Sequence, residues 1–316
     1  MKTLPCRGRF APSPSGRLHL GNMLSSLLAW LDVRSLGGEM VFRLEDLDPD
    51  RSTRENALLM AEDLEWLGLD WDMGWRPGEQ EDYMQSQRSE LYEQQFNKLL
   101  DEGRIYPCFC TRAQRLAASA PHPGEEREIG CGCHRRSREE IQALVQSGRK
   151  PSYKMQVDSR EIRFTDGHYG PQSAQLTQGA DDFIIRRADG VFAYQFAVSY
   201  DDAVMGISRV VRGCDLLSST PKQIWLIEHL GYPAPTYCHA PMIVTEQGRK
   251  MSKREGGLTM EVLREKNTPA QLCGKLAYTA GLLDRPEAIT PRELIPLFSW
   301  DKVSKDPIFL PEGLYE

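Results

Sequence analysis

The spacing of hydrophobic positions changes along the first forty residues, and this change predicts a strand followed by a helix. Residues 7–11 have the pattern of a short strand. The residues after it forbid both a helix and a central strand (Pro12, Pro14 and Gly16). Leucines then recur at helical spacing on one face (Leu20, Leu24, Leu27, Leu28 and Leu31). The pair Gly37-Gly38 is a left-handed C-cap signal, so we expect the helix to end there.

Residues 39–44 predict a second strand, and acidic residues follow it. Carboxylates at the carboxyl end of a strand lie at the rim where α/β sheets bind ligands. Glu45 is therefore a candidate ligand-binding residue. Asp46 and Asp48 fit equally well as turn and cap residues.

Two helices are expected next. Ser52 and Glu55 form a capping-box pattern, which opens a helix through Trp66 that Gly68 closes. Residues 87–102 have the pattern of another amphipathic helix. The strand–helix–strand–helix order predicts an α/β fold with a doubly wound, Rossmann-like parallel sheet.

The middle of the chain departs from this order. A short helix is expected from Ser137 to about Gln146, and strands in the 150s and 160s. Residues 183–188 and 191–196 predict a hairpin, because the Asp189-Gly190 pair between them is typical of a type I′ turn. Tyr194 stands among alternating apolar residues in the second strand, where it fits a core aromatic.

A strand is predicted over 208–215, and the helix after it begins near Pro221 and ends at Gly231. Arg212 near the end of that strand is well placed for a bidentate grip on a carboxylate, or for a surface ion pair. Residues 262–283 have helical patterning and predict a small C-terminal annex.

Composition narrows the possible functions. The chain has 316 residues, 40% of them hydrophobic and 27% charged, which suits one large or two modest globular domains. Its formal net charge of −6 argues against bulk, nonspecific nucleic-acid binding, so RNA contacts would use local basic patches. No apolar run reaches eighteen residues and residues 1–8 lack a signal-peptide pattern, so we expect a cytoplasmic protein without a membrane partner.

The first helix begins with His19-Leu20-Gly21-Asn22. The glycine motifs GxGxxG and GxxxxGK[ST] are both absent, so two large classes of nucleotide-binding protein drop out. His19 is able to donate to a phosphate oxygen, and Gly21 permits an adenine ring to approach the helix. A histidine near a helix start is more often a structural hydrogen-bonding group.

A second polar segment, Arg249-Lys250-Met251-Ser252-Lys253-Arg254, follows the apolar run 241–244. Alone it fits a solvated run of charges. Together, however, the two segments resemble the paired HIGH and KMSKS motifs of class I aminoacyl-tRNA synthetases. The resemblance implies an ATP site.

Four cysteines form two CxC pairs, Cys108 with Cys110 and Cys131 with Cys133. Four thiolates are enough for a closed tetrahedral zinc site, and His134 is an alternative fourth ligand. Four buried thiols without a metal remain the other possibility. A structural zinc would stabilise an insertion too small for a core of its own.

The chain resembles the catalytic core of glutamyl-tRNA synthetases over nearly all of residues 7–255. Four segments carry the resemblance: Gly8 to Gly16, Arg43 to Asp48, Phe192 to Asp202, and Val211 to Leu217. The chain has no room for the large anticodon-binding region of that family. A short core with a CxC insertion is similar to the glutamyl-queuosine tRNA(Asp) synthetase family, whose members place glutamate on the queuosine base at the wobble position.

The resemblance implies roles for matching residues. L-Glutamate would be held by eight of them (Arg9, Phe10, Ala11, Pro12, Ser13, Glu45, Tyr194 and Arg212). Arg212 would pair with the side-chain carboxylate and Glu45 would bind the α-ammonium. ATP, with Mg²⁺, would be bound and activated by five residues (His19, Gly21, Asn22, Lys250 and Lys253). The four cysteines would hold one structural Zn²⁺.

Three positions depart from the family pattern. Asn22 and Arg254 occupy the last positions of the two ATP-site motifs, and Ile129 stands where the short family often has a tyrosine ligand. The third ligand is therefore open, and chemistry favours Cys131.

The implied organisation is a catalytic domain in two halves, 1–106 and 191–232, separated by a zinc-bearing, acceptor-binding insertion at 107–190. Residues 233–316 would hold the basic loop and the annex, in a monomeric protein that uses L-glutamate, ATP and queuosine-bearing tRNA(Asp). Three alternatives remain: a truncated or discriminating glutamyl-tRNA synthetase that charges the tRNA 3′ end, another class I nucleotidyltransferase, and a non-catalytic tRNA-binding paralogue.

Overall fold

A parallel sheet forms the centre of the computed structural model, which describes residues 6–111, 131–244, 258–311 and 313–315. Its strands are β1 (Arg7–Phe10), β2 (Glu39–Phe42), β3 (Met73–Gly74), β9 (Arg209–Gly213) and β10 (Thr236–Ala240). The Ser208 N–H donates to the Arg7 carbonyl at 2.9 Å, which places β9 beside β1 on the side away from β2. The strand order is therefore β3-β2-β1-β9-β10, so the predicted α/β, doubly wound parallel arrangement is confirmed.

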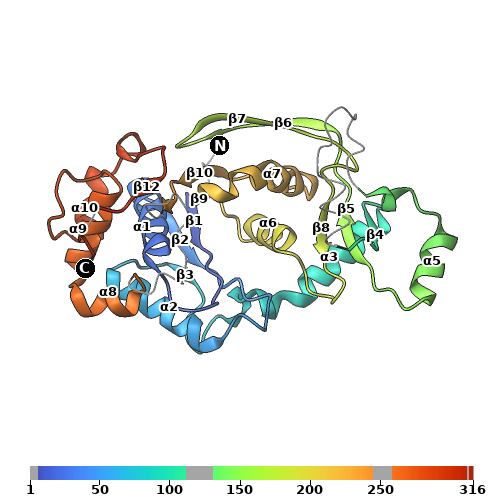
Figure 1. Cartoon of the computed structure of the whole chain (residues 1–316), viewed down its shortest axis with the longest axis horizontal. Helices are drawn as coiled ribbons and strands as arrows, with labels where there is room; N and C mark the ends of the chain where they lie inside the picture. The colour runs from blue at the N-terminus through green and yellow to red at the C-terminus, as the bar shows by residue number, and fades with distance from the viewer. Residues whose placement is uncertain (1–5, 112–130, 245–257, 312, 316) are drawn as a thin grey trace.

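Helices cover the sheet and create two cores. They are α1 (Leu20–Ser35), α2 (Arg54–Leu67), α3 (Ser89–Asp101), α6 (Tyr194–Val204) and α7 (Thr220–His229). The five leucines that predicted α1 are all buried in the core shared with α2. A second core contains buried side chains of α3, α6 and α7, and Figure 1 shows where these helices lie. Among the described residues, no helix has the length and apolar character needed to span a lipid bilayer.

The middle of the chain builds an antiparallel region at one end of the molecule (Figure 1). It consists of β4 (Ile105–Cys108), α5 (Arg138–Gln146), β5 (Ser152–Met155), β6 (Arg160–Asp166), β7 (Gly170–Leu176) and β8 (Phe183–Arg186). The order β4-β5-β8 forms one sheet, and β6 pairs with β7 in a long hairpin. That hairpin extends over α7 back to β10, so its turn reaches the central sheet.

The C-terminal annex packs against α1 and α2 at the other end (Figure 1). Its elements are β11 (Ile243–Val244), α8 (Met260–Lys266), α9 (Pro269–Thr279), α10 (Pro291–Leu294) and β12 (Ile308–Phe309). The single helical stretch predicted over 262–283 is two helices, because Thr268 caps a new helix with Pro269 in its first turn. The indole Nε1 of Trp300 donates to Asp32 of α1 at 2.6 Å.

The second strand of the predicted hairpin at 183–196 is wrong. An isolated bridge joins Arg186 to Phe192, and helix α6 then begins at Tyr194. The alternation over 191–196 is therefore too short to define a strand, and burial continues along one helical face. The type I′ turn is also wrong, since it requires a positive φ at both central residues and only Gly190 has one.

Two helix predictions need smaller corrections. The N-cap of α2 is Thr53 rather than Ser52, and its Oγ1 accepts a hydrogen bond from the Asn56 N–H at 3.1 Å. Helix α3 begins at Ser89 rather than at residue 87, and it buries Phe96 and Leu99 while Leu91 and Leu100 are exposed.

We predict that Thr53→Ala lowers the free energy of unfolding by about 1 kcal/mol, because it removes the acceptor for a helix-terminal N–H. Ser52→Ala leaves that hydrogen bond intact and is the matched control. Urea denaturation of both variants measures the difference. Equal midpoints would contradict the assignment of the cap.

Candidate active site

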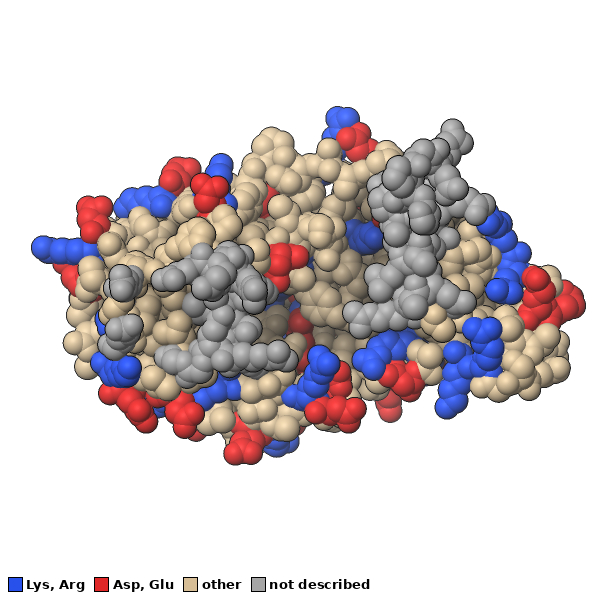
Figure 2. Space-filling model, in the orientation of Figure 1, with Lys and Arg blue, Asp and Glu red and all other residues tan. Residues whose placement is uncertain are grey.

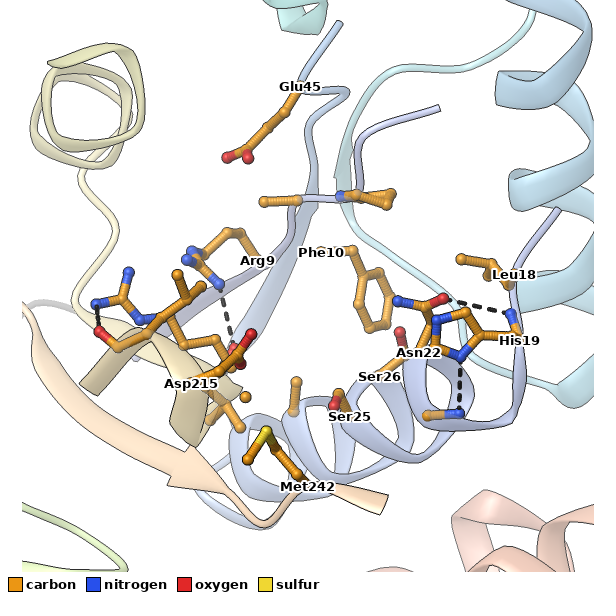
Figure 3. A pocket seen from close by; sticks show the side chains of 18 of the residues that line it. Arg9, Phe10, Leu18, His19, Asn22, Ser25, Ser26, Glu45, Asp215 and Met242 are labelled. Atoms are coloured by element: carbon orange, nitrogen blue, oxygen red, sulfur yellow. Dashed lines mark hydrogen bonds between the residues drawn. The ribbon is translucent and has the colours of Figure 1, made fainter. Parts of the chain in front are cut away.

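A cleft of about 280 Å³ opens where the carboxyl ends of β1 and β9 diverge. This is the point where the strand order reverses, and open α/β sheets bind ligands at such points. The turn after β1, the first turns of α1, the end of β9 and the segment after β10 line it. Figure 2 shows a hollow near the middle of this face, and Figure 3 shows the lining side chains converging on it.

His19 caps the N-terminus of α1 at the wall of this cleft. Its Nδ1 accepts a hydrogen bond from the Gly21 N–H at 3.1 Å, which leaves the proton of the neutral ring on Nε2. The Asn22 Oδ1 accepts from the His19 N–H at 3.3 Å, completing a capping box (Figure 3). A methyl group on Gly21 would lie 3.1 Å from the imidazole, so this position also preserves the orientation of His19. A helix N-terminus with an N–H donor is a suitable binding site for phosphate.

Sequence reasoning missed the next turn of α1. Ser25, Ser26 and Ala29 also line the cleft, one and two turns beyond Asn22. Their spacing of three, four and seven residues from Asn22 is the pattern that identifies a shared helical face. Their small side chains leave space against the helix.

Lys250 and Lys253 lie outside the described residues, together with the rest of 245–257. The described residues on both sides of that segment contact the cleft region. Ile243 lines the cleft. On the other side, the Leu258 carbonyl accepts a hydrogen bond from the Leu20 N–H at 3.0 Å. The chain therefore leaves the described structure next to the cleft and re-enters it beside the first turn of α1.

Most residues implied to hold glutamate line the cleft (Arg9, Phe10, Ala11, Pro12, Glu45, Tyr194 and Arg212). Ser13 instead lines a neighbouring cavity of about 460 Å³. Glu45 and Tyr194 line both spaces, so the two cavities adjoin. Tyr194 is the first residue of α6 and is 38% exposed, so the prediction of a core aromatic is wrong.

Glu45 belongs to a buried cluster of charged residues and is the member of that cluster whose carboxylate lines the cleft. Its Oε1 accepts a hydrogen bond from the Arg43 Nη2 at 3.2 Å, and Arg43 is completely buried. The Arg43 Nη1 lies 2.8 Å from Asp202, and Asp202 also lies 3.4 Å from the Arg9 Nε. Burial raises the pKa of Glu45, and the nearby Arg43 charge opposes that rise. Asp202 belongs to the matched motif, but its role as a partner of two arginines was not predicted.

Arg212 differs from Arg9 and Arg43 because its partners are neutral. Its Nη1 donates to the Gln223 Oε1 at 2.6 Å, and its Nη2 donates to the Thr220 Oγ1 at 2.8 Å. Its Nε faces the His239 Nε2 at 3.1 Å, and its guanidinium lies over the Tyr237 ring. It forms no ion pair with any described residue and is 6% exposed, so the surface ion pair considered above is wrong. A buried cation without a counter-ion favours an anionic ligand.

The bidentate grip expected of Arg212 also needs revision. Its Nη2 makes a second hydrogen bond, to the Leu216 carbonyl at 3.3 Å. Four of the five guanidinium N–H groups are therefore engaged, and one N–H on Nη1 remains. A carboxylate can take this N–H alone, or two N–H groups after one existing bond is released.

The four cysteines of the two CxC pairs meet at the end of β4. Their sulfur atoms all lie within 4.8 Å of one another, with Cys108 and Cys131 at 3.4 Å and Cys110 and Cys133 at 3.5 Å. Four sulfurs at about 2.3 Å from a central Zn²⁺ would be about 3.8 Å apart, so the group fits a tetrahedral metal. The ring of His134 faces the Cys131 carbonyl at 3.3 Å and is not part of the group. Ile129 lies outside the described residues.

The electrostatics of this group also suit a cation. A hydrogen bond from the Cys108 thiol lowers the pKa of Cys131, which favours a thiolate in this group. The Lys154 Nζ lies 3.9 Å from the same sulfur. The Cys108 carbonyl accepts from the Ser152 Oγ at 3.1 Å, which connects β4 to β5 beside the cluster.

Comparison with known proteins identifies the class. The family model described as "tRNA synthetases class I (E and Q), catalytic domain" matches residues 5–308. A glutamate–tRNA ligase from Elizabethkingia meningosepticum, solved in complex with its amino acid, superimposes with a TM-score of 0.80. The two are 26% identical, and the match covers 99% of this chain and 68% of that one. The fold is therefore that of a class I synthetase catalytic domain.

Relatives of similar length narrow the family. The chain is 45% identical to a glutamyl-Q tRNA(Asp) synthetase of Symbiobacterium thermophilum, over 96% of this chain and 95% of that protein. It is 40% identical to a glutamyl-Q tRNA(Asp) synthetase of Nitratidesulfovibrio vulgaris, over 98% of this chain and 97% of that protein. A glutamate–tRNA ligase of Carboxydothermus hydrogenoformans is 39% identical over 95% of this chain, but only 64% of that protein is matched. This chain belongs to the glutamyl-Q tRNA(Asp) synthetase family of class I tRNA synthetases.

The cysteine group predicts one equivalent of bound divalent metal per chain. Cys131→Ser should lose most of that metal, because it removes the ligand that ionises most readily. Cys273→Ser changes a buried cysteine that is not part of the group and should retain it. Elemental analysis of the purified proteins measures the metal, and equal contents in the two variants would contradict the assignment.

Proposed function

We propose that this protein activates L-glutamate with ATP and transfers the glutamyl group to the queuosine base at the wobble position of tRNA(Asp). The observation that carries the activation step is the cleft itself. There Arg212, which has no carboxylate partner among the described residues, and the acidic Glu45 line the same space as the capped N-terminus of α1. The names of the relatives that match over nearly their whole length support the choice of acceptor.

The cleft offers complementary charges for glutamate. Arg212 binds the side-chain carboxylate, and Glu45 binds the α-ammonium. Arg9, Phe10, Ala11 and Pro12 form the wall between them, with Tyr194 opposite. Ser13 acts from the edge of the neighbouring cavity.

ATP occupies the part of the cleft beside α1. His19 donates from Nε2 to a phosphate oxygen, and Gly21 and Asn22 line the nucleotide. Lys250 and Lys253 neutralise the triphosphate together with Mg²⁺. The positions of Ile243 and Leu258 support this, because the chain leaves the described structure next to the cleft and re-enters it beside the first turn of α1.

Activation requires no general base, because the α-carboxylate of glutamate is already ionised at neutral pH. One of its oxygens attacks the α-phosphorus of ATP, the bond from that phosphorus to the bridging oxygen breaks, and pyrophosphate leaves. The protein contributes by positioning the reactants and stabilising negative charge on the transferring group. We therefore expect His19 and Lys253 to bind the transferring phosphate group more tightly in the transition state than in the ground state.

The neighbouring cavity suits the acceptor nucleoside. It adjoins the glutamate site through Glu45 and Tyr194, and Arg51 and Arg187 line it. A nucleotide bound there would lie next to the activated carboxyl group. Arg187 also lines the depression beside Cys108, which brings the cysteine group close to the acceptor cavity.

We also propose that the metal is a structural zinc held by Cys108, Cys110, Cys131 and Cys133, and that the protein acts as a monomer. The divisions 1–106 with 191–232, 107–190 and 233–316 remain our domain assignment. Their proposed roles are catalysis, acceptor binding and support of the ATP loop.

Lys253→Ala should lower the rate of glutamate-dependent ATP–pyrophosphate exchange by orders of magnitude, with a smaller change in the KM for ATP, because its charge acts in the transition state. The matched control is Lys266→Ala, an exposed lysine in the last turn of α8. Near-normal exchange by Lys253→Ala would exclude that role.

The acceptor is tested with radiolabelled glutamate, ATP and bulk tRNA from cells that make queuosine and from cells that do not. We expect labelled tRNA only with queuosine, and nuclease mapping should place the label in the anticodon loop. Labelling of the 3′ end in both tRNA pools would instead support a truncated glutamyl-tRNA synthetase, the alternative favoured by the match to the Carboxydothermus ligase.

A further inference from the structure

A chain of buried polar groups leads from the β6–β7 hairpin to Arg212. Asp166, the last residue of β6, is 1% exposed, and His239 on β10 is completely buried. The Asp166 Oδ2 lies 2.6 Å from the His239 Nδ1, and the His239 Nε2 lies 3.1 Å from the Arg212 Nε. The two ring nitrogens of one histidine thus connect a carboxylate to the arginine of the cleft.

The partners assign the protons in this chain. The Arg212 Nε carries a hydrogen and is only a donor, so the His239 Nε2 must accept. The His239 Nδ1 must then carry the ring proton and donate to Asp166. Burial lowers the pKa of His239, with the Arg212 charge acting in the same direction, which is consistent with a neutral ring.

Asp166 is held in place by further donors. Its Oδ1 accepts from the backbone N–H groups of His168 at 3.0 Å, Tyr169 at 2.9 Å and His239 at 3.3 Å. Burial alone would raise the pKa of Asp166, but these hydrogen bonds and the one from His239 lower it. The carboxylate is therefore ionised and fixed in one orientation.

We propose that Asp166 and His239 are positioning residues that determine specificity for an acidic amino acid by fixing the guanidinium of Arg212. Asp166 selects the Nδ1–H form of His239, and the free Nε2 of that ring then orients Arg212 without neutralising its charge. A carboxylate in direct contact would compete with the substrate, whereas a neutral imidazole does not. This inference rests on the proposed role of Arg212 in glutamate binding.

Asp166→Asn should reverse the arrangement. The single amide oxygen is expected to stay with the three backbone N–H groups, which directs the NH₂ group toward the His239 Nδ1. His239 would then accept at Nδ1 and carry its proton on Nε2, opposite the Arg212 N–H. The Thr220 Oγ1, 3.2 Å from the same nitrogen, could accept this proton, but the Arg212 Nε would lose its acceptor and the guanidinium would no longer be fixed by His239.

The test compares Asp166→Asn with Asp182→Asn. Asp182 is also buried, and it also accepts from two backbone N–H groups and one side-chain donor, Tyr106, but it does not contact His239 or Arg212. We expect Asp166→Asn to raise the KM for glutamate roughly 10- to 100-fold, the usual effect of altering a partner behind a ligand. The Asp166→Asn variant should fold, and its KM for ATP should match that of the Asp182→Asn variant. Its preference for glutamate over glutamine should be lower.

Nitrogen-15 NMR of the histidine rings, with His239 assigned from a His239→Asn variant, tests the geometry without substrate. The expected result is the Nδ1–H form in the unmodified protein and the Nε2–H form in Asp166→Asn. An Nε2–H or doubly protonated His239 in the unmodified protein would overturn the proposal, as would an unchanged KM for glutamate in a folded Asp166→Asn variant. If the unmodified protein shows no glutamate-dependent exchange, the proposed function fails and the role in specificity fails with it, whereas the NMR result still decides whether Asp166 and His239 fix the guanidinium of Arg212.

Discussion

The arrangement of the cleft depends on the ion pairs that the fully buried guanidinium of Arg43 forms with carboxylates. Arg43 lies directly after β2 and faces Asp202 of α6 and Glu45 at the cleft wall. A second carboxylate of α6, Asp201, accepts from Arg88 at 2.8 Å and from the Tyr92 hydroxyl at 2.7 Å. Removing one partner from a buried ion pair typically costs about 3–5 kcal/mol, because the remaining charge stays buried. The cluster therefore fixes α3 and α6 against the sheet and sets the position of Glu45.

Arg43 lies behind the wall of the cleft and Arg212 lines it, and the two have opposite electrostatic environments. Arg43 is surrounded by carboxylates and needs no ligand, whereas Arg212 has only neutral partners among the described residues. The cleft consequently has an acidic side at Glu45 and a basic side at Arg212. A zwitterion with a second carboxylate matches that polarity, which agrees with the family to which the chain belongs.

Local sequence patterns were enough to predict several features of the structure. The leucine repeat of α1, the parallel strands and the two CxC pairs all follow from spacing along the chain. Residues 191–196 were misassigned because six alternating residues fit a strand as well as the start of a helix. The partners of Arg212 were not predictable, since Thr220, Gln223 and His239 come from two elements and meet only through tertiary packing. The contact between Asp166 and His239 was not predictable either, because Asp166 lies in a separate hairpin that meets β10 only in the folded protein.

The carboxylate of Asp32 has a consequence for how the molecule unfolds. It accepts from Arg209 of β9 at 2.6 Å and from the indole of Trp300 at 2.6 Å, so one side chain of α1 joins the sheet to the annex. The annex also shares the hydrophobic core of α1 and α2, while α6 and α7 belong to the other core. Cooperative units follow such shared burial rather than order along the chain. Amides of α9, whose buried face lies in this shared core, should therefore exchange with deuterium as slowly as those of α1, although more than two hundred residues separate the two helices in sequence.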